Sequence, residues 1–238
     1  FRRSREDSDL VQRCLHKGIK LKQTFGAIVY HFTCTSSRGK DWFKNDNIEA
    51  QNRVKIQNQA DQIELKRFIR KWGGFNHGTE KLNKYDVDLE IQNSSKLPPH
   101  IISNIEPLFS RVWIDDAAVS KIINEDISKE HELANKLLNF TDKQWEKTSK
   151  YHNLDNYSEI FLLQDDHILE YDVKLTIDGN TLENSDFEVI NQIHKIIENY
   201  DRGHYEYGNI KLSIYKKNTI NNTVCTNPDF DMNLLKIS

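Results

Sequence analysis

Residues 185–200 read SDFEVINQIHKIIENY, and this stretch carries the clearest helical pattern of the chain. Ser185 and Glu188 have the spacing of a capping box at its start. The apolar residues recur with helical periodicity and would form one stripe: Val189, Ile190, Ile193, Ile196, Ile197 and Tyr200. The stretch therefore predicts an amphipathic helix from residue 186 to 200.

Segments typical of strands lie on both sides of this helix. Residues 171–177 alternate apolar and polar side chains, and residues 209–215 follow the helix. Earlier segments predict a strand at 109–114, a helix at 128–138 and a strand at 159–164. This β-α-β-β-α-β order is typical of a ferredoxin-like α+β domain, in which two helices cover one face of a four-stranded antiparallel sheet. Asp115-Asp116 would end a strand and Asp165-Asp166 would occupy a hairpin turn.

The domain limits follow from breaks in these patterns. Residues 94–100 contain two serines and Pro98-Pro99, which interrupt both periodicities and indicate a linker. We expect the ferredoxin-like domain to span 99–217, after a helical extension and linker at 46–98. A long helix in that extension would end at Gly73-Gly74. Residues 218–238 predict an irregular tail.

Composition excludes several classes of protein. Lysine and arginine number 33 against 36 acids, a net charge of -3, so no overall positive field would attract a nucleic acid. No apolar run approaches the roughly 20 residues of a transmembrane helix. Three cysteines are too few for a disulfide framework. We expect a soluble, cytoplasmic protein without a transmembrane segment or a nucleic-acid partner.

The first 31 residues combine acids with a buried strand. Glu6, Asp7 and Asp9 begin an amphipathic helix that would end before Gly18. Residues 27–32 form an apolar run with the composition of a strand, and His31 lies at its end. By themselves these acids could be ordinary first-turn acids, and the histidine a hydrogen-bonded structural residue.

The order of these features resembles a known family. Residues 6–10 (EDSDL), Gly18 and residues 27–31 (AIVYH) are similar to the end of the catalytic domain in family 2 glycosyltransferases, which have a GT-A fold. The resemblance covers about residues 1 to 45. It implies that this part is an α/β remnant of a GT-A, or nucleotide-diphospho-sugar transferase, domain.

The resemblance also implies a reaction and roles for several residues. The reaction would be an inverting sugar transfer in which Asp7 is the general base for the acceptor hydroxyl, and Glu6 orients Asp7 or touches the acceptor. His31 would help to hold a divalent metal ion, Mn²⁺ or Mg²⁺, that acts as a Lewis acid at the departing nucleoside diphosphate.

The polar loop after this strand could contact the diphosphate. Ser36, Ser37, Arg38 and Lys40 supply hydroxyls and cations that suit phosphate oxygens, although a solvated turn has the same composition. We also assign Asp9 to this substrate-binding group.

The nucleotide-binding half of a GT-A domain is absent from these 238 residues. We therefore expect the carboxy-terminal, acceptor-side part of the enzyme, inactive alone, whose partners are a nucleotide-sugar donor and a glycan, lipid-linked or protein acceptor. The second domain would serve acceptor binding or homo-oligomerisation. The alternative is a non-catalytic module that binds a protein or a glycan. Residues 72–78, rich in aromatics and glycine, could offer a platform to a sugar ring or simply end a helix.

Overall fold

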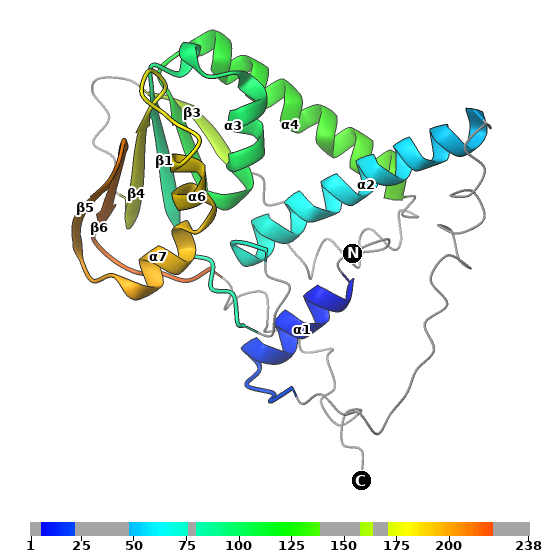
Figure 1. The fold of residues 1–238 in the computed structure, drawn as a ribbon, viewed down its shortest axis with the longest axis horizontal. Coiled ribbons are helices and arrows are strands. Elements are labelled where there is room, and N and C mark those ends of the chain that lie inside the picture. The colour runs from blue at the N-terminus through cyan, green and yellow to red at the C-terminus, as the bar shows by residue number, and fades with distance from the viewer. Residues whose placement is uncertain (1–5, 22–47, 76–79, 139–157, 164–170, 221–238) are drawn as a thin grey trace.

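The computed structural model describes residues 6–21, 48–75, 80–138, 158–163 and 171–220. Two helices come first, α1 (Glu6–His16) and α2 (Ile48–Trp72). Both confirm the helices expected from the sequence. The expected strand at 27–32 lies outside the described residues. A larger α/β unit follows, built on a single sheet (Figure 1).

The sheet has six strands in the order β3-β2-β1-β4-β6-β5. Strands β3 (Glu159–Leu162), β2 (Arg111–Ile114), β1 (Val87–Gln92) and β4 (Val173–Asp178) pair in parallel. Strands β6 (Ile210–Ile214) and β5 (Gly203–Tyr207) complete the sheet with antiparallel pairing. The unit is therefore an α/β fold with a mixed sheet.

The apolar core lies on one face of this sheet. Val87, Leu89 and Ile91 of β1 are fully buried there, and the alternate residues of β2, β4 and β6 join them in one cluster. The helices that supply the other side of this cluster are α3 (Pro99–Ile105), α4 (Ala117–Leu138), α6 (Asp186–Asn191) and α7 (Ile193–Asn199). Two short 3-10 turns, η1 (Ser94–Lys96) and η2 (Glu106–Leu108), flank α3.

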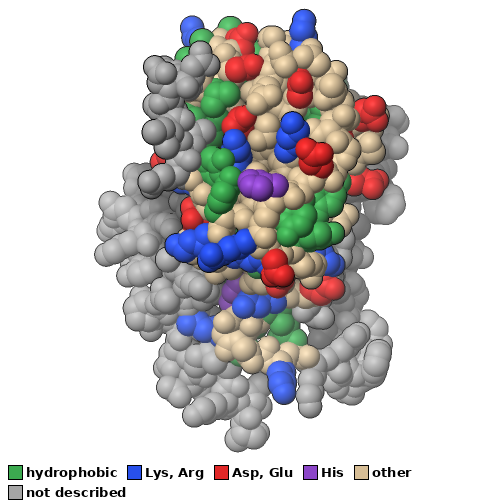
Figure 2. Space-filling view, turned by 90° about the vertical axis from the view of Figure 1, so that its left-hand side faces the viewer, with side chains coloured by type: hydrophobic (Ala, Val, Ile, Leu, Met, Phe, Trp, Pro, Cys, Tyr) green, Lys and Arg blue, Asp and Glu red, His purple; other side chains and the backbone are tan. Residues whose placement is uncertain are grey.

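The opposite face of the sheet is polar. Four neighbouring strands place side chains of alternating charge beside one another across this face: Glu159, Arg111, Asp88 and Lys174. Ser213 and His204 continue the row on β6 and β5. Asp88 is buried, but Arg111 forms an ion pair with it at 2.6 Å and the Trp113 indole donates a hydrogen bond to it at 2.8 Å. Opposite charges on adjacent strands stabilise a sheet. Figure 2 shows acidic, basic and hydrophobic side chains interspersed around the histidine at the centre of the side that it views.

The ferredoxin-like prediction is wrong. Such a domain needs four antiparallel strands, whereas four of the six strands here are parallel. The expected hairpin between β3 and β4 does not exist, because β2 and β1 lie between those strands; Asp165 and Asp166 themselves lie outside the described residues. The prediction rested on the order of the elements, and that order omitted β1 and β5. Apolar and polar residues alternate along the strands because the helices packed on the core, among the described residues, cover one face of the sheet.

The expected boundary at residue 99 cuts through this sheet. Strand β1 lies inside the segment 46–98, which we expected to be helical extension and linker, and it pairs with β2 and β4 near the middle of the sheet. The sequence pattern did not indicate a strand here because two of its buried residues, Asp88 and Glu90, are acids. Strand β5 was also missed. The expected linker at 94–100 holds η1 and the start of α3.

The helix expected at 186–200 is interrupted. The chain forms α6 and α7, separated at Gln192, whose backbone leaves the helical conformation. Ser185 makes no side-chain capping bond, so the expected capping box is not formed. Instead the Asp186 carboxylate accepts a hydrogen bond from the backbone N–H of Glu183. The apolar stripe is nevertheless correct, since Ile190, Ile193 and Ile197 are fully buried.

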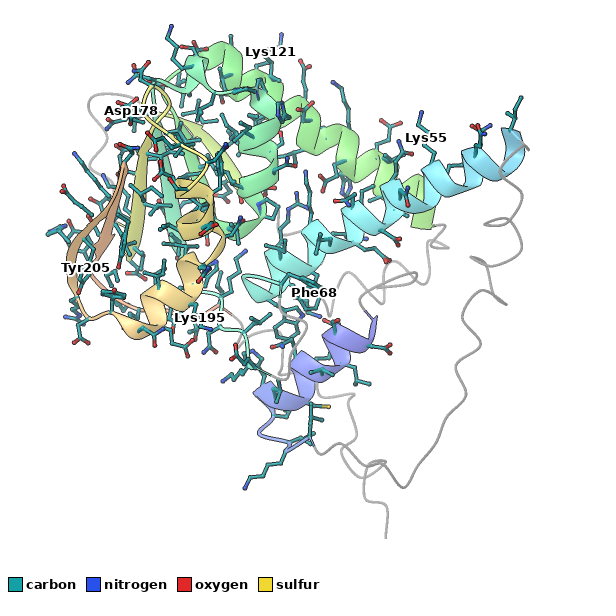
Figure 3. The ribbon with its side chains drawn as sticks, in the orientation of Figure 1. Lys55, Phe68, Lys121, Asp178, Lys195 and Tyr205 are labelled. Carbon is teal, nitrogen blue, oxygen red and sulfur yellow. The ribbon has the colours of Figure 1, made fainter. Side chains whose placement is uncertain are left out.

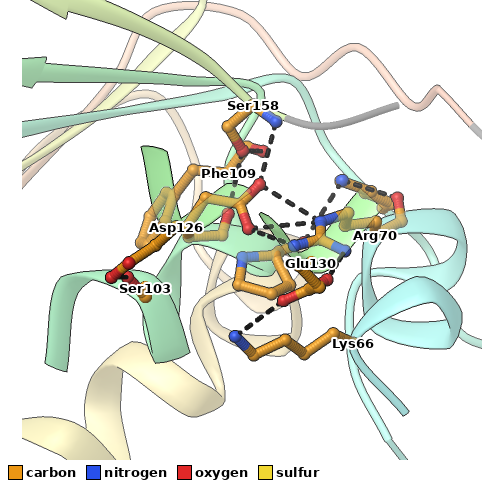
Figure 4. A network of polar contacts seen from close by, with 10 residues as sticks. Lys66, Arg70, Ser103, Phe109, Asp126, Glu130 and Ser158 are labelled. Carbon is orange, nitrogen blue, oxygen red and sulfur yellow. Dashed lines mark hydrogen bonds and ion pairs between the residues drawn. The ribbon is translucent and has the colours of Figure 1, made fainter. Parts of the chain in front are cut away.

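A buried ion pair joins α2 to the α/β unit (Figure 4). Arg70 of α2 donates to Glu106 of η2, with Nη2 2.6 Å from Oε2, and both side chains are almost completely buried. Arg70 Nη1 also contacts Glu130 of α4 at 2.7 Å, and Lys66 contacts the same carboxylate at 3.0 Å. Glu106 further accepts a hydrogen bond from the backbone N–H of Ser158, beside β3. One guanidinium and its carboxylates thus link four parts of the fold.

Burial by itself would raise the pKa of Glu106, but the Arg70 guanidinium and its hydrogen bonds outweigh burial and lower the pKa. The carboxylate is therefore ionised in the folded protein. Its contribution to stability is present at neutral pH and is lost as the pH falls below the ordinary range of a glutamate.

Arg70→Met should lower the free energy of unfolding by about 3–5 kcal/mol, because it leaves the Glu106 charge buried without its partner. Urea unfolding at pH 7 measures this loss. The double variant Arg70→Met with Glu106→Gln should recover part of the loss, since a neutral amide can still accept the hydrogen bond from Ser158. A loss below about 1 kcal/mol in the single variant would show that the pair does not hold α2 in place.

Candidate functional site

The acids of α1 have two different environments. Asp9 is buried and accepts bonds from Lys71 Nζ at 2.5 Å, Trp72 Nε1 at 2.9 Å and Arg13 Nε at 2.7 Å. Asp7 lies in the first turn of the same helix and is exposed. Asp9 therefore fixes α1 against the end of α2, while Asp7 faces the solvent.

This environment corrects the role expected for Asp9. Burial alone would raise the pKa of Asp9, but the charges of Lys71 and Arg13 outweigh burial and lower the pKa. Its carboxylate is thus ionised and already bound to two cations and an indole. A buried carboxylate is not accessible to a diphosphate, and its negative charge would repel one. Asp9 is therefore a structural anchor.

Further contacts attach α1 to the segment after α2. Gln12 donates from Nε2 to the carbonyl of Glu80 and accepts the N–H of Leu82 at Oε1. His16 lies 2.8 Å from the carbonyl of Leu82 and stacks on the Trp72 ring at 5.1 Å. These contacts join positions 56 to 70 residues apart, and they hold α1 in one orientation.

The other expected site residues cannot be placed beside Asp7. Glu6 is the first residue of α1. His31, Ser36, Ser37, Arg38 and Lys40 lie outside the described residues. Within the described ranges, no group of three His, Cys, Asp or Glu side chains is arranged to hold a metal ion. The parts of the chain that the structure describes also contain no helix with the length and apolarity to cross a bilayer.

A cleft of about 260 Å³ lies where the end of α2 meets α7. The labelled residues Phe68 on α2 and Lys195 on α7 mark the two sides of this junction in Figure 3. Three segments line the cleft: residues 72–75, residues 80–83, and positions 191, 192, 194, 195 and 198 of α6, α7 and the break between them.

The glycines that end α2 make this cleft possible. Gly73 has φ +81°, and a Cβ there would lie 2.9 Å from His194 Cδ2 and from the backbone of Lys84. Only glycine allows α2 to end this close to α7. A Cβ on Gly74, by contrast, would meet no atom within 4 Å, and Gly74 is one of the residues that line the cleft. The sequence indicated that α2 ends at these glycines but not that a cleft forms beside them.

His194 forms part of the cleft wall, and both of its ring nitrogens have a hydrogen-bond partner. Its Nδ1 accepts the N–H of Tyr85 at 3.1 Å, and its Nε2 lies 2.7 Å from the carbonyl of Leu108. Burial and the neighbouring Lys84 charge lower the pKa of His194 to about 3. It is therefore a neutral structural residue at physiological pH. Burial also lowers the pKa of Lys84 to about 8.

Sequence reasoning missed Lys71 and Trp72 as the partners of Asp9. No local pattern joins residues separated by more than sixty positions. One signal was present, since a tryptophan directly before Gly73-Gly74 needs a partner for its indole N–H when buried.

No family model, curated protein or solved structure matches this chain.

Asp9→Asn should destabilise the fold by about 3 kcal/mol, because it leaves the buried Lys71 ammonium without its carboxylate. Asp7→Asn should change the free energy of unfolding by less than about 0.5 kcal/mol, since that side chain is exposed. Chemical denaturation of both variants measures this contrast. Equal losses would contradict the division of roles between the two acids.

The free energy of unfolding should fall between pH 7 and pH 5, because His194 stays neutral in the folded protein while the same histidine takes up a proton in the unfolded chain. Its folded pKa of about 3 lies below the 6.5 of an ordinary histidine, so the unfolded chain binds a proton first as the pH falls. The expected loss from this residue is about 2 kcal/mol between pH 7 and pH 5. Urea unfolding of the wild type and of His194→Gln at both pH values isolates this contribution, because the variant should lack the loss of stability that His194 causes. An unchanged pH dependence in the variant would contradict the assignment.

Proposed function

We propose that this chain is the acceptor-side part of an inverting glycosyltransferase, with Asp7 as the general base. The observation that carries the proposal is the separation of roles on α1. One acid, Asp9, is buried and fixes the helix, and a second acid two residues earlier is exposed at the amino-terminal end of that helix.

A base for sugar transfer needs this arrangement more than it needs an unusual pKa. The carboxylate must reach the acceptor hydroxyl from a fixed direction, and fixed geometry is a large part of catalysis. The positive end of the helix dipole favours an ionised carboxylate in the first turn. The contacts of Asp9, Gln12 and His16 supply the rigidity.

In the proposed reaction, the acceptor oxygen attacks the anomeric carbon of a nucleoside diphosphate sugar. The new C–O bond forms as the bond to the diphosphate breaks, and the diphosphate leaves with that electron pair. The hydroxyl proton passes to the Asp7 carboxylate. The configuration at the anomeric carbon is inverted, because attack and departure occur on opposite faces.

Further residues remain part of this proposal. Glu6 orients Asp7 or touches the acceptor. On the donor side are Ser36, Ser37, Arg38 and Lys40 at the diphosphate, and a divalent cation, Mn²⁺ or Mg²⁺, with His31 as a ligand.

The test is Asp7→Asn in the full-length gene product, with release of nucleoside diphosphate measured across nucleotide-sugar donors. Turnover should fall by about 100- to 10,000-fold, because an amide cannot accept the proton. The melting temperature should not change. The exposed acid Glu125 on α4 provides a matched control, and Glu125→Gln should keep full turnover.

Wild-type turnover in Asp7→Asn would exclude Asp7 as the base. If the wild-type product transfers no sugar from any donor, the enzyme proposal fails and the non-catalytic binding module takes its place. The resemblance over residues 1 to 45 favours the enzyme.

A further inference from the structure

We propose that the cleft between α2 and α7 is a subsite for one uncharged sugar unit of the acceptor glycan. This inference rests on the proposed function, because it names the acceptor as a neutral carbohydrate. The cleft holds about 260 Å³, slightly less than the range of about 300–1,000 Å³ typical of small-molecule pockets. Its size therefore suits a single ring rather than a nucleotide.

The charges of the cleft favour a neutral ligand. Two acids, Glu80 and Glu198, and two cations, Lys81 and Lys195, line it. Lys195 lies 3.6 Å from Glu80, and the Asn83 amide donates to Glu198 at 2.8 Å. His194 is uncharged, as its hydrogen bonds require. A phosphate or a carboxylate would find no excess of positive charge here, so an anionic ligand is disfavoured.

The polar groups of the cleft match the hydroxyls of a sugar. Asn83, Asn191 and Gln192 each carry an amide that both donates and accepts hydrogen bonds, as a hydroxyl does. Carboxylates add acceptors, and lysines add donors. Phe75 contributes a partly exposed aromatic ring, which can cover the apolar face of a sugar.

The cleft is physically connected to the helix that carries Asp7. The segment that holds α1 through Gln12 and His16 also lines the cleft, with Glu80 and Leu82 in both roles. Asp7 and His16 are nine residues apart on α1, or about 14 Å at the rise of an α-helix. A short oligosaccharide is long enough to follow α1 over that length, and we place one unit in the cleft and the terminal hydroxyl at Asp7.

Gly74 allows the cleft to be blocked without disturbing the fold. A side chain there would enter open space, and its backbone does not need a left-handed conformation. Gly74→Leu should therefore fill the cleft and keep the melting temperature. Gly73→Ala would not serve, because its Cβ would collide with His194 and Lys84.

The experiment measures binding of the 238-residue chain to an array of neutral, sialylated and sulfated oligosaccharides, followed by titration of the best neutral probe by saturation-transfer NMR. We expect neutral probes to bind, and Gly74→Leu to weaken binding at least tenfold. Gln192→Ala should weaken it by a smaller factor, since one amide is lost from the surface. Lys129→Ala, an exposed change on α4, should bind as the wild type does.

Three results would overturn the inference: no neutral oligosaccharide binds, anionic ones bind in preference, or Gly74→Leu binds like the wild type while remaining folded. Binding requires neither donor nor turnover. A protein that binds neutral glycans through the cleft but shows no dependence of turnover on Asp7 would retain this subsite and lose the proposed catalytic function. If turnover depends on Asp7 but no glycan binds at the cleft, the proposed catalytic function stands and the subsite is excluded.

Discussion

The buried pair between Arg70 and Glu106 is the interaction on which the arrangement of the described parts depends. Both side chains are almost completely out of water, and the guanidinium also binds Glu130. Removing such charges from water is unfavourable, and only a nearly complete set of hydrogen bonds offsets the cost. Lys84 donates to the carbonyl of Arg70 and Ser158 donates to Glu106, so the neighbouring backbone takes part in the same network. The pair determines where α2 ends relative to the sheet.

The position of the end of α2 then determines the site. Lys71 and Trp72 follow Arg70 directly, and they bind Asp9. Gly73 contacts the wall of the cleft, and Gly74 opens into it. The same five residues of α2 and its terminus thus connect the α/β unit, the helix that carries Asp7 and the cleft. Displacing this segment would change all three together, so the buried charges bear on the proposed function as well as on stability.

The sheet illustrates how one pattern can have two structural causes. Strict alternation in residues 87–92 and 173–178 is usual for antiparallel strands with one wet face. Here it occurs in parallel strands, because all the described helices in the core cover a single face and the other face carries paired charges. The ion pairs of Asp88 with Arg111 and of Glu90 with Lys174 allow acids to occupy a central strand.

The sequence by itself determined the helices α1 and α2, most of the strands and the apolar stripe of α6 and α7, because these depend on periodicity within a few residues. It also showed that α2 ends at Gly73-Gly74, since glycine tolerates the left-handed backbone at position 73. Only the tertiary structure decided the parallel pairing, the place of β1 in the sheet and the break at Gln192. It also decided that Asp9 is an anchor while Asp7 is exposed. These features depend on contacts between residues 20 to 110 positions apart, such as Arg70 with Glu106 and Tyr85 with His194, and no local pattern encodes which distant partner will neutralise a buried charge.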